Sequence, residues 1–107
     1  MNTLFIDTTS NQEITVAISK NGIEEKITQQ LTNHKSQIVL PLIEKLLKKQ
    51  QMTLHDLNAI SVNPGPGSFT GVRVGVSVAN ALSFALQIPV NGKIFSENTP
   101  LVEPIYG

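Results

Sequence analysis

The segment of this sequence whose residue types best suit ligand binding is a loop rich in glycine and proline, residues 63–71. An apolar helix is predicted to follow it at once, and a helix N-terminus presents unpaired N–H groups and partial positive charge to anions. A P-loop needs a Lys-Ser/Thr pair after its second glycine, where this sequence has Val72 and Arg73. The dinucleotide-binding pattern also fails, because Thr70 stands where its last glycine is required. We therefore favour a structural role, in which Ser68 or Thr70 caps the helix.

Metal and acid-base chemistry find little support in the sequence. Asp7 follows the first apolar run and precedes two threonines, a pattern that suits either a magnesium ligand or an ordinary Asx turn. No second carboxylate is placed to form a catalytic pair with it. His34 and His55 are far apart and belong to no zinc-binding motif. We expect no catalytic residue, no metal site and no cofactor.

Small residues recur every four positions along the predicted second helix and form a nearly smooth ridge on it: Gly67, Gly71, Gly75, Ala79 and Ser83. Glycine inside a helix costs about 1 kcal/mol relative to alanine, so this ridge indicates that another backbone packs closely against it. The other faces of the helix are apolar too, and one sheet cannot bury every face. We therefore predict an interface with another chain, formed by Leu42, Leu46, Gly67, Gly71, Val72, Gly75, Val76, Ala79, Leu82 and Ser83. The alternative is that the two helices and the C-terminal segment bury one another within one chain.

Hydrophobic periodicity predicts the elements that position these residues. Apolar residues that alternate with polar ones indicate strands, the dipeptide Asn21-Gly22 favours a hairpin turn, and an apolar stripe at three-to-four-residue spacing indicates an amphipathic helix. Pro41 lies inside that stripe, so this helix is either kinked or begins its regular part there. The expected order β-β-β-α-β-α-β has strands near 5–6, 14–19, 23–28, 57–62 and 88–90 and helices near 34–50 and 70–86. This order predicts an α/β fold with a mixed sheet of about five strands.

Length and composition restrict the remaining possibilities. The chain has 107 residues, eight basic and eight acidic side chains, and no cysteine. A formal net charge of zero argues against a stand-alone nucleic-acid binder, and the lack of cysteine excludes a disulfide framework. The uncharged run 74–86 is shorter than the roughly 20 residues that cross a bilayer. With no secretory pattern at Met1, we expect a cytoplasmic protein with no membrane contact.

Three segments of the sequence resemble the TsaB (YeaZ) family: residues 5–9, residues 40–43 and, most specifically, residues 65–75. The resemblance extends from about residue 3 to residue 92. The family loop is formed by Gly65, Pro66, Gly67, Ser68, Phe69, Thr70, Gly71 and Arg73.

The resemblance implies the half-domain of a ribonuclease-H-like, actin-like ATPase fold, because TsaB proteins have two such domains and this chain has room for one. It also implies a non-catalytic scaffold subunit in the formation of tRNA N6-threonylcarbamoyladenosine at position 37. The implied partners are the catalytic subunit TsaD, the ATPase TsaE and, when the chain is alone, a second copy of itself. Contact with tRNA would be indirect.

One domain is expected, an actin-like ATPase N-terminal-type domain at residues 1–95, followed by an extended C-terminal tail at residues 96–107. Two other functions stay open at this point. One is a small nucleotide-binding hydrolase that uses Asp7 and the loop 65–71. The other is a glycoprotease-like protein-interaction module unrelated to tRNA.

Overall fold

The computed structural model describes residues 1–30, 38–67, 69–94, 102, 103 and 105. Its elements are, in chain order, β1 (Asn2–Asp7), β2 (Glu13–Lys20), β3 (Ile23–Gln30), α1 (Val39–Lys49), the short 3-10 turn η2 (Leu54–Asp56), β4 (Ala59–Val62) and α2 (Phe69–Leu86). The predicted mixed α/β class is confirmed. The predicted residues 34–37 of the first helix and most of the predicted tail lie outside the described residues.

The four strands form one sheet in the order β3-β2-β1-β4. β1 to β3 form an antiparallel meander, whereas β4 pairs parallel to β1 with Leu4 opposite Ile60. Asn21 and Gly22 both have positive φ angles, 52° and 88°, as the predicted hairpin turn between β2 and β3 requires. The parallel strand reaches the sheet through α1, which is the crossover that a β-α-β order demands.

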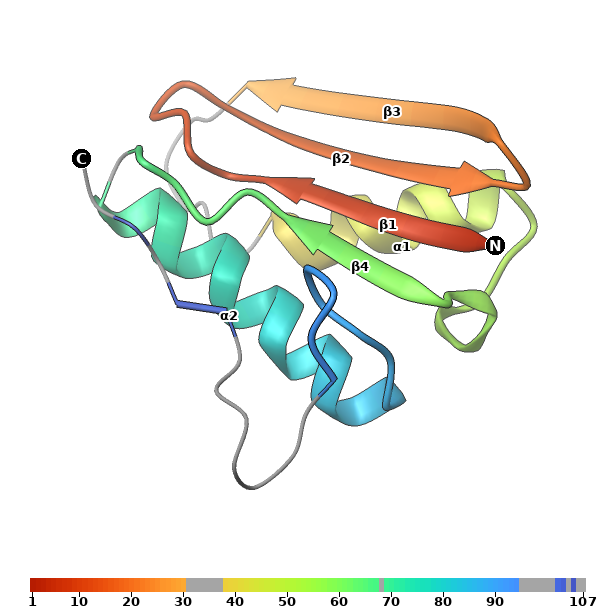
Figure 1. The fold of residues 1–107 in the computed structure, drawn as a ribbon. Coiled ribbons are helices and arrows are strands. Elements are labelled where there is room, and N and C mark those ends of the chain that lie inside the picture. Colours follow the sequence, from red (N-terminus) through yellow and green to blue (C-terminus); the bar gives the residue numbers. More distant parts are fainter. Residues whose placement is uncertain (31–37, 68, 95–101, 104, 106–107) are drawn as a thin grey trace.

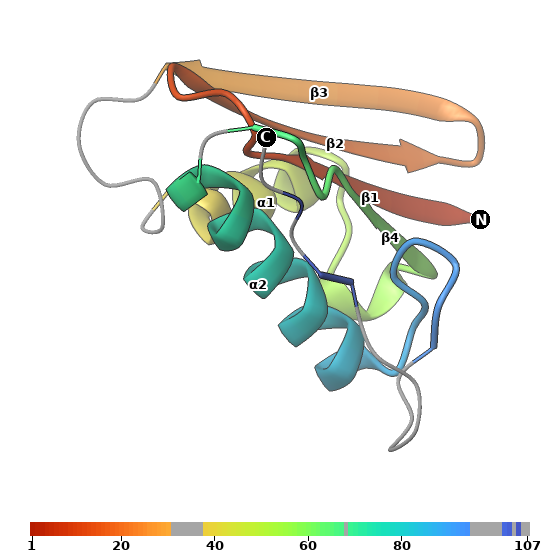
Figure 2. The same cartoon turned by 60° about the vertical axis from the view of Figure 1, so that its left-hand side comes forward.

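The core lies between one face of the sheet and the two helices, which cover that face only (Figure 1 and Figure 2). Alternate residues of the strands turn to this side, and Leu4, Ile14 and Ile18 are fully buried there. The amphipathic pattern of α1 is confirmed, because its buried residues are those of the predicted stripe: Val39, Leu42, Ile43, Leu46 and Leu47. Pro41 lies in the first turn of α1, where a missing N–H costs no helical hydrogen bond.

The expectation of a fifth strand at residues 88–90 is wrong in its extent. Val90 forms only isolated bridges, a parallel one with Ile60 and an antiparallel one with Lys93. Pro89 has no N–H to give to a ladder, and the chain turns back immediately at Asn91 and Gly92, which both have positive φ angles. The Asn91 side chain replaces part of the missing ladder: it accepts a hydrogen bond from Val62 N at 2.8 Å and donates one to Val62 O at 2.9 Å.

No helix in the described part of the chain has the length and apolar character needed to span a bilayer.

Candidate functional site

The turn after β1 is an Asx turn. The Oδ1 atom of Asp7 accepts hydrogen bonds from the main-chain N of Thr9 at 2.9 Å and from its Oγ1 at 2.7 Å. Oδ2 accepts one from Nδ2 of Asn63, at the end of β4, at 3.3 Å. Burial alone would raise the pKa of Asp7, but the hydrogen bonds from Thr9 and Asn63 outweigh it and hold that pKa below its ordinary value of 3.8. The carboxylate is therefore ionised and serves to join the ends of two neighbouring strands.

A small hollow of about 250 Å³ lies beside this turn and is lined by Phe5, Ile6, Asp7, Thr15, Ser61, Val62 and Asn63. Of the described residues in that lining, Asp7 alone has an ionisable side chain. Among the residues that the structure describes, no three His, Asp or Glu side chains gather into a possible metal site.

Thr8 connects this turn to α2. Its side chain is fully buried, and its Oγ1 donates a hydrogen bond to Gly71 O at 2.5 Å and accepts one from Gly75 N at 3.1 Å. A side chain at position 75 would collide with Thr8 Oγ1, and one at position 67 would lie 2.6 Å from the Cβ atom of Thr9. The glycines are therefore needed where the end of β1 meets α2.

The prediction that the small-residue ridge is left uncovered for another chain is wrong. The ridge faces the chain's own turn after β1, and at its far end Ser83 Oγ donates a hydrogen bond to Ile88 O at 2.6 Å. Of the predicted interface residues, Gly67 is half-buried and the rest are buried within the single chain: Leu42, Leu46, Gly71, Val72, Gly75, Val76, Ala79, Leu82 and Ser83. A repeat of small residues indicates close approach of a backbone, but it does not say which backbone, and here the chain supplies its own.

A different face of α2 is open. Val74 and Val78 are half-buried and Ala81 and Ala85 are exposed, and these positions are separated by four, three and four residues. This spacing is that of the contact seam in paired helices. We call these four residues the outer seam.

A hollow of about 360 Å³ lies on the outer seam, where α2 passes the first turn of α1. It is lined by Leu40, Ser77, Val78, Ala81, Leu82 and Ala85, none of which carries a charge. Leu40 is 43% exposed, although it is an aliphatic side chain on a helix whose other apolar residues are mostly buried. The shape and chemistry of this surface suit the side chains of a second helix.

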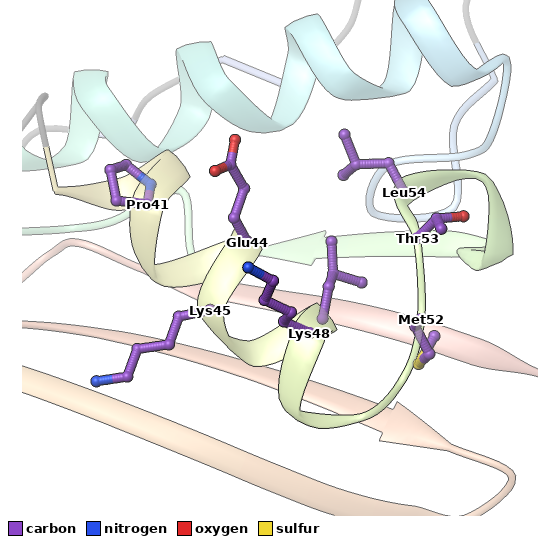
Figure 3. Close-up of a pocket in the computed structure, with 8 residues that line it drawn as sticks. Pro41, Glu44, Lys45, Lys48, Met52, Thr53 and Leu54 are labelled. Carbon is purple, nitrogen blue, oxygen red and sulfur yellow. The ribbon is translucent and has the colours of Figure 1, made fainter.

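A wider groove of about 530 Å³ continues from the first turn of α1 towards η2 (Figure 3). Leu47 and Met52 are buried at its base, whereas Glu44 and Lys48 are exposed at its rim. Figure 3 shows Glu44 and Leu54 on opposite sides of the groove, which Lys45 also lines. The groove is thus a polar-edged extension of the outer surface of the helical layer.

The loop 65–71 has a structural basis for its composition. Gly65 has φ +110°, the Gly65–Pro66 peptide bond is cis, and a side chain at position 65 would strike the carbonyl of Ile105. Arg73 and Thr70 are exposed in the first turns of α2. Of the two expected caps, Thr70 lies inside the helix, which begins at Phe69, and Ser68 lies outside the described residues. The loop therefore fixes how α2 leaves the sheet.

Sequence reasoning missed the outer seam and the contact between Asn80 and Val102. The spacing of Val74, Val78, Ala81 and Ala85 is visible in the sequence, but the more regular glycine repeat beside it concealed the signal.

Comparison with known proteins identifies the family. A family model described as "TsaD: tRNA N6-adenosine threonylcarbamoyltransferase" matches residues 8–92. The tRNA threonylcarbamoyladenosine biosynthesis protein TsaB of Bacillus subtilis is 41% identical over 93 residues, which are 85% of this chain and 40% of that protein. TsaB of Buchnera aphidicola from Schizaphis graminum is 36% identical over 89 residues, 83% of this chain and 42% of that protein.

The solved structure of YeaZ from Pseudomonas aeruginosa superposes with a TM-score of 0.79 at 34% identity and covers 83% of this chain and 41% of that one. The chain thus spans about two fifths of the length of the curated relatives cited here. The family model covers most of the chain, and the resemblance of its sequence to TsaB is confirmed by curated relatives and by a solved structure. We conclude that the chain belongs to the TsaD family and is similar, within it, to the TsaB (YeaZ) proteins.

Proposed function

We propose that this chain is a non-catalytic scaffold subunit in the formation of tRNA N6-threonylcarbamoyladenosine, where it binds and supports a TsaD-like catalytic subunit. The observation that carries the proposal is the uncharged outer seam on α2, with Leu40 of α1 beside it. An apolar hollow at the surface of a small protein is costly unless a partner covers it. The names of the TsaB relatives supply the process in which that partner acts.

The TsaD-like identity of the partner is supported by the family model itself. Because this chain matches a model built for TsaD over residues 8–92, a TsaD protein has related elements in the same order. Two related helical layers can pack face to face about a twofold axis, outer seam against outer seam. The same geometry serves a second copy of this chain, so we propose a homodimer in the absence of TsaD.

A scaffold role also agrees with the charges. The chain carries no net charge, so we propose that tRNA is bound by the partner and reached by this chain only indirectly. A TsaE-like ATPase would join through the complex. We propose that the chain performs this scaffold function in the cytoplasm. We assign no catalytic residue, because the carboxylate of Asp7 already accepts hydrogen bonds from Thr9 and Asn63.

The proposal is tested by co-expressing the chain with the TsaD-like protein of the same source. We expect the two to co-purify, and we expect threonylcarbamoyladenosine in tRNA, measured by mass spectrometry of nucleosides, to require both chains. The chain alone, mixed with ATP and magnesium, should show no turnover. Saturable ATP hydrolysis by the pure chain would instead favour a small hydrolase built on Asp7, and capture of other proteins without TsaD would favour an interaction module unrelated to tRNA.

A further inference from the structure

The described C-terminal residues lie against α2 and against the loop that follows β4 (Figure 1 and Figure 2). Asn80, near the middle of α2, donates a hydrogen bond from Nδ2 to Val102 O at 2.8 Å. Its Oδ1 accepts one from Val102 N at 3.2 Å. One amide side chain therefore pairs with both main-chain groups of Val102, as a neighbouring strand would.

A second main-chain contact lies further along the same segment. Ile105 N donates a hydrogen bond to Pro64 O at 2.6 Å. The carbonyl of Ile105 lies so close to Gly65 that any side chain there would collide with it. The described C-terminal residues thus contact both the Asn80 side of α2 and the loop after β4.

Among the described residues of this segment, 102, 103 and 105, only Val102 has a buried side chain. Val102 is 9% exposed and belongs to the hydrophobic core, whereas Glu103 is exposed and Ile105 is 52% exposed. These contacts therefore hold the main chain and one aliphatic residue of the segment.

We propose that Asn80, Pro64 and Gly65 form a peptide-binding groove, and that the segment containing Val102 and Ile105 is its occupant, held in cis and exchangeable with the same sequence supplied in trans. Recognition through main-chain hydrogen bonds with one side-chain pocket is the mode by which proteins bind extended peptides at strand-like edges. Consecutive residues of a helix point about 100° apart, so Asn80 lies on a different side of α2 from its neighbour Ala81 in the outer seam. The groove is thus a second binding site and does not depend on the function proposed above.

The test uses the full chain with Val102→Asp, because a carboxylate cannot remain in the core and the cis segment is released. The probe is a fluorescein-labelled peptide with the sequence of residues 100–107, followed by fluorescence anisotropy. We expect saturable binding to the Val102→Asp chain and much weaker binding to the native chain, since its tethered segment competes at a high effective concentration. The same peptide with Asp in place of its Val102 should not bind.

Control variants distinguish binding of the peptide in the groove from non-specific binding elsewhere on the chain. Adding Asn80→Leu to the Val102→Asp chain should weaken peptide binding by about tenfold or more, because two hydrogen bonds are lost. Adding Lys26→Leu, an exposed position on the edge strand β3, should leave binding unchanged. A folded Val102→Asp chain that fails to bind the peptide, or equal binding with and without Asn80→Leu, would overturn the proposal.

A second measurement applies if Val102→Asp does not fold. The chain has no cysteine, so a spin label attached at Glu103→Cys reports on that one position. We expect an immobilised spectrum in the otherwise native chain and a mobile one when Asn80→Leu is added. A spectrum unaffected by Asn80→Leu would show that Asn80 does not hold the segment, and it would overturn the proposal equally.

Discussion

Thr8 joins the end of β1 to α2 through one buried hydroxyl. Gly71 O and Gly75 N are an i, i+4 pair of the helix, and Thr8 Oγ1 contacts both. The contact is possible only because position 75 has no side chain. At the scale of single residues, the glycines of α2 therefore act within the chain, where they fix the turn after β1 against the helix.

A double-mutant cycle tests this contact. Gly75→Ala should lower the free energy of unfolding by about 1–3 kcal/mol, because the new methyl group overlaps a buried hydroxyl. Thr8→Ala alone should also destabilise, since it leaves two main-chain groups without that hydroxyl. In the double variant the methyl group of residue 75 has room. The double variant should therefore lose less free energy of unfolding, measured in urea, than the sum of the two single losses. Ser77→Ala, on the exposed side of α2, serves as control, and strict additivity would contradict the contact.

Asp7 leads to a prediction of how the free energy of unfolding depends on pH. Its pKa is lower in the folded chain than its ordinary value of 3.8, so the unfolded chain takes up the proton first as the pH falls. The stabilisation from Asp7 is therefore fully present above pH 3.8 and is lost as the pH falls through the folded pKa. Urea unfolding across this acid range should show a shallower loss of stability for Asp7→Asn than for the native chain. Glu44→Gln, which removes an exposed carboxyl, is the matched control, and an unchanged slope for Asp7→Asn would refute this role.

At the scale of elements, the strands and helices were largely predictable because each depends on a local pattern. The alternation of Ile14, Val16 and Ile18 and the dipeptide Asn21-Gly22 are enough to predict the hairpin of β2 and β3. The missing N–H of Pro89 is visible in the sequence and argues against a full fifth strand. What the sequence does not show is that a side chain takes over part of the ladder. That side chain, Asn91, makes a tertiary contact with β4, and no local sequence pattern indicates this contact.

The two Asn-Gly turns allow a matched test of that contact. Asn91 and Asn21 both have positive φ angles, 49° and 52°, so glycine fits the backbone at either position. Asn91→Gly removes two hydrogen bonds to Val62 and should lower the free energy of unfolding by about 1–3 kcal/mol. Asn21→Gly, at an exposed hairpin, should change it by only a few tenths of a kcal/mol. Equal effects in thermal or urea unfolding would contradict the role given to the Asn91 side chain.

At the scale of the whole molecule, one small sheet with helices on a single face leaves the outer side of the helical layer open. The sequence correctly predicted that α2 is apolar on more sides than one sheet can cover, but it did not predict which side remains. Which side of α2 is buried depends on Thr8 and Thr9, which lie near the N-terminus and pack against the glycine face of the helix. The outer seam, with Leu40 beside it, stays open. It is the surface on which we propose that a partner packs.

The most direct test of this account is capture of the TsaD-like protein by the chain with Ala81→Glu. A charge in the centre of the outer seam should abolish capture and self-association in sedimentation, while the free energy of unfolding changes by less than about 0.5 kcal/mol because Ala81 is exposed. Lys26→Glu, an exposed position on the edge strand β3, should capture the partner as the native chain does. Full capture by a folded Ala81→Glu chain would contradict the assignment of the outer seam as the partner interface.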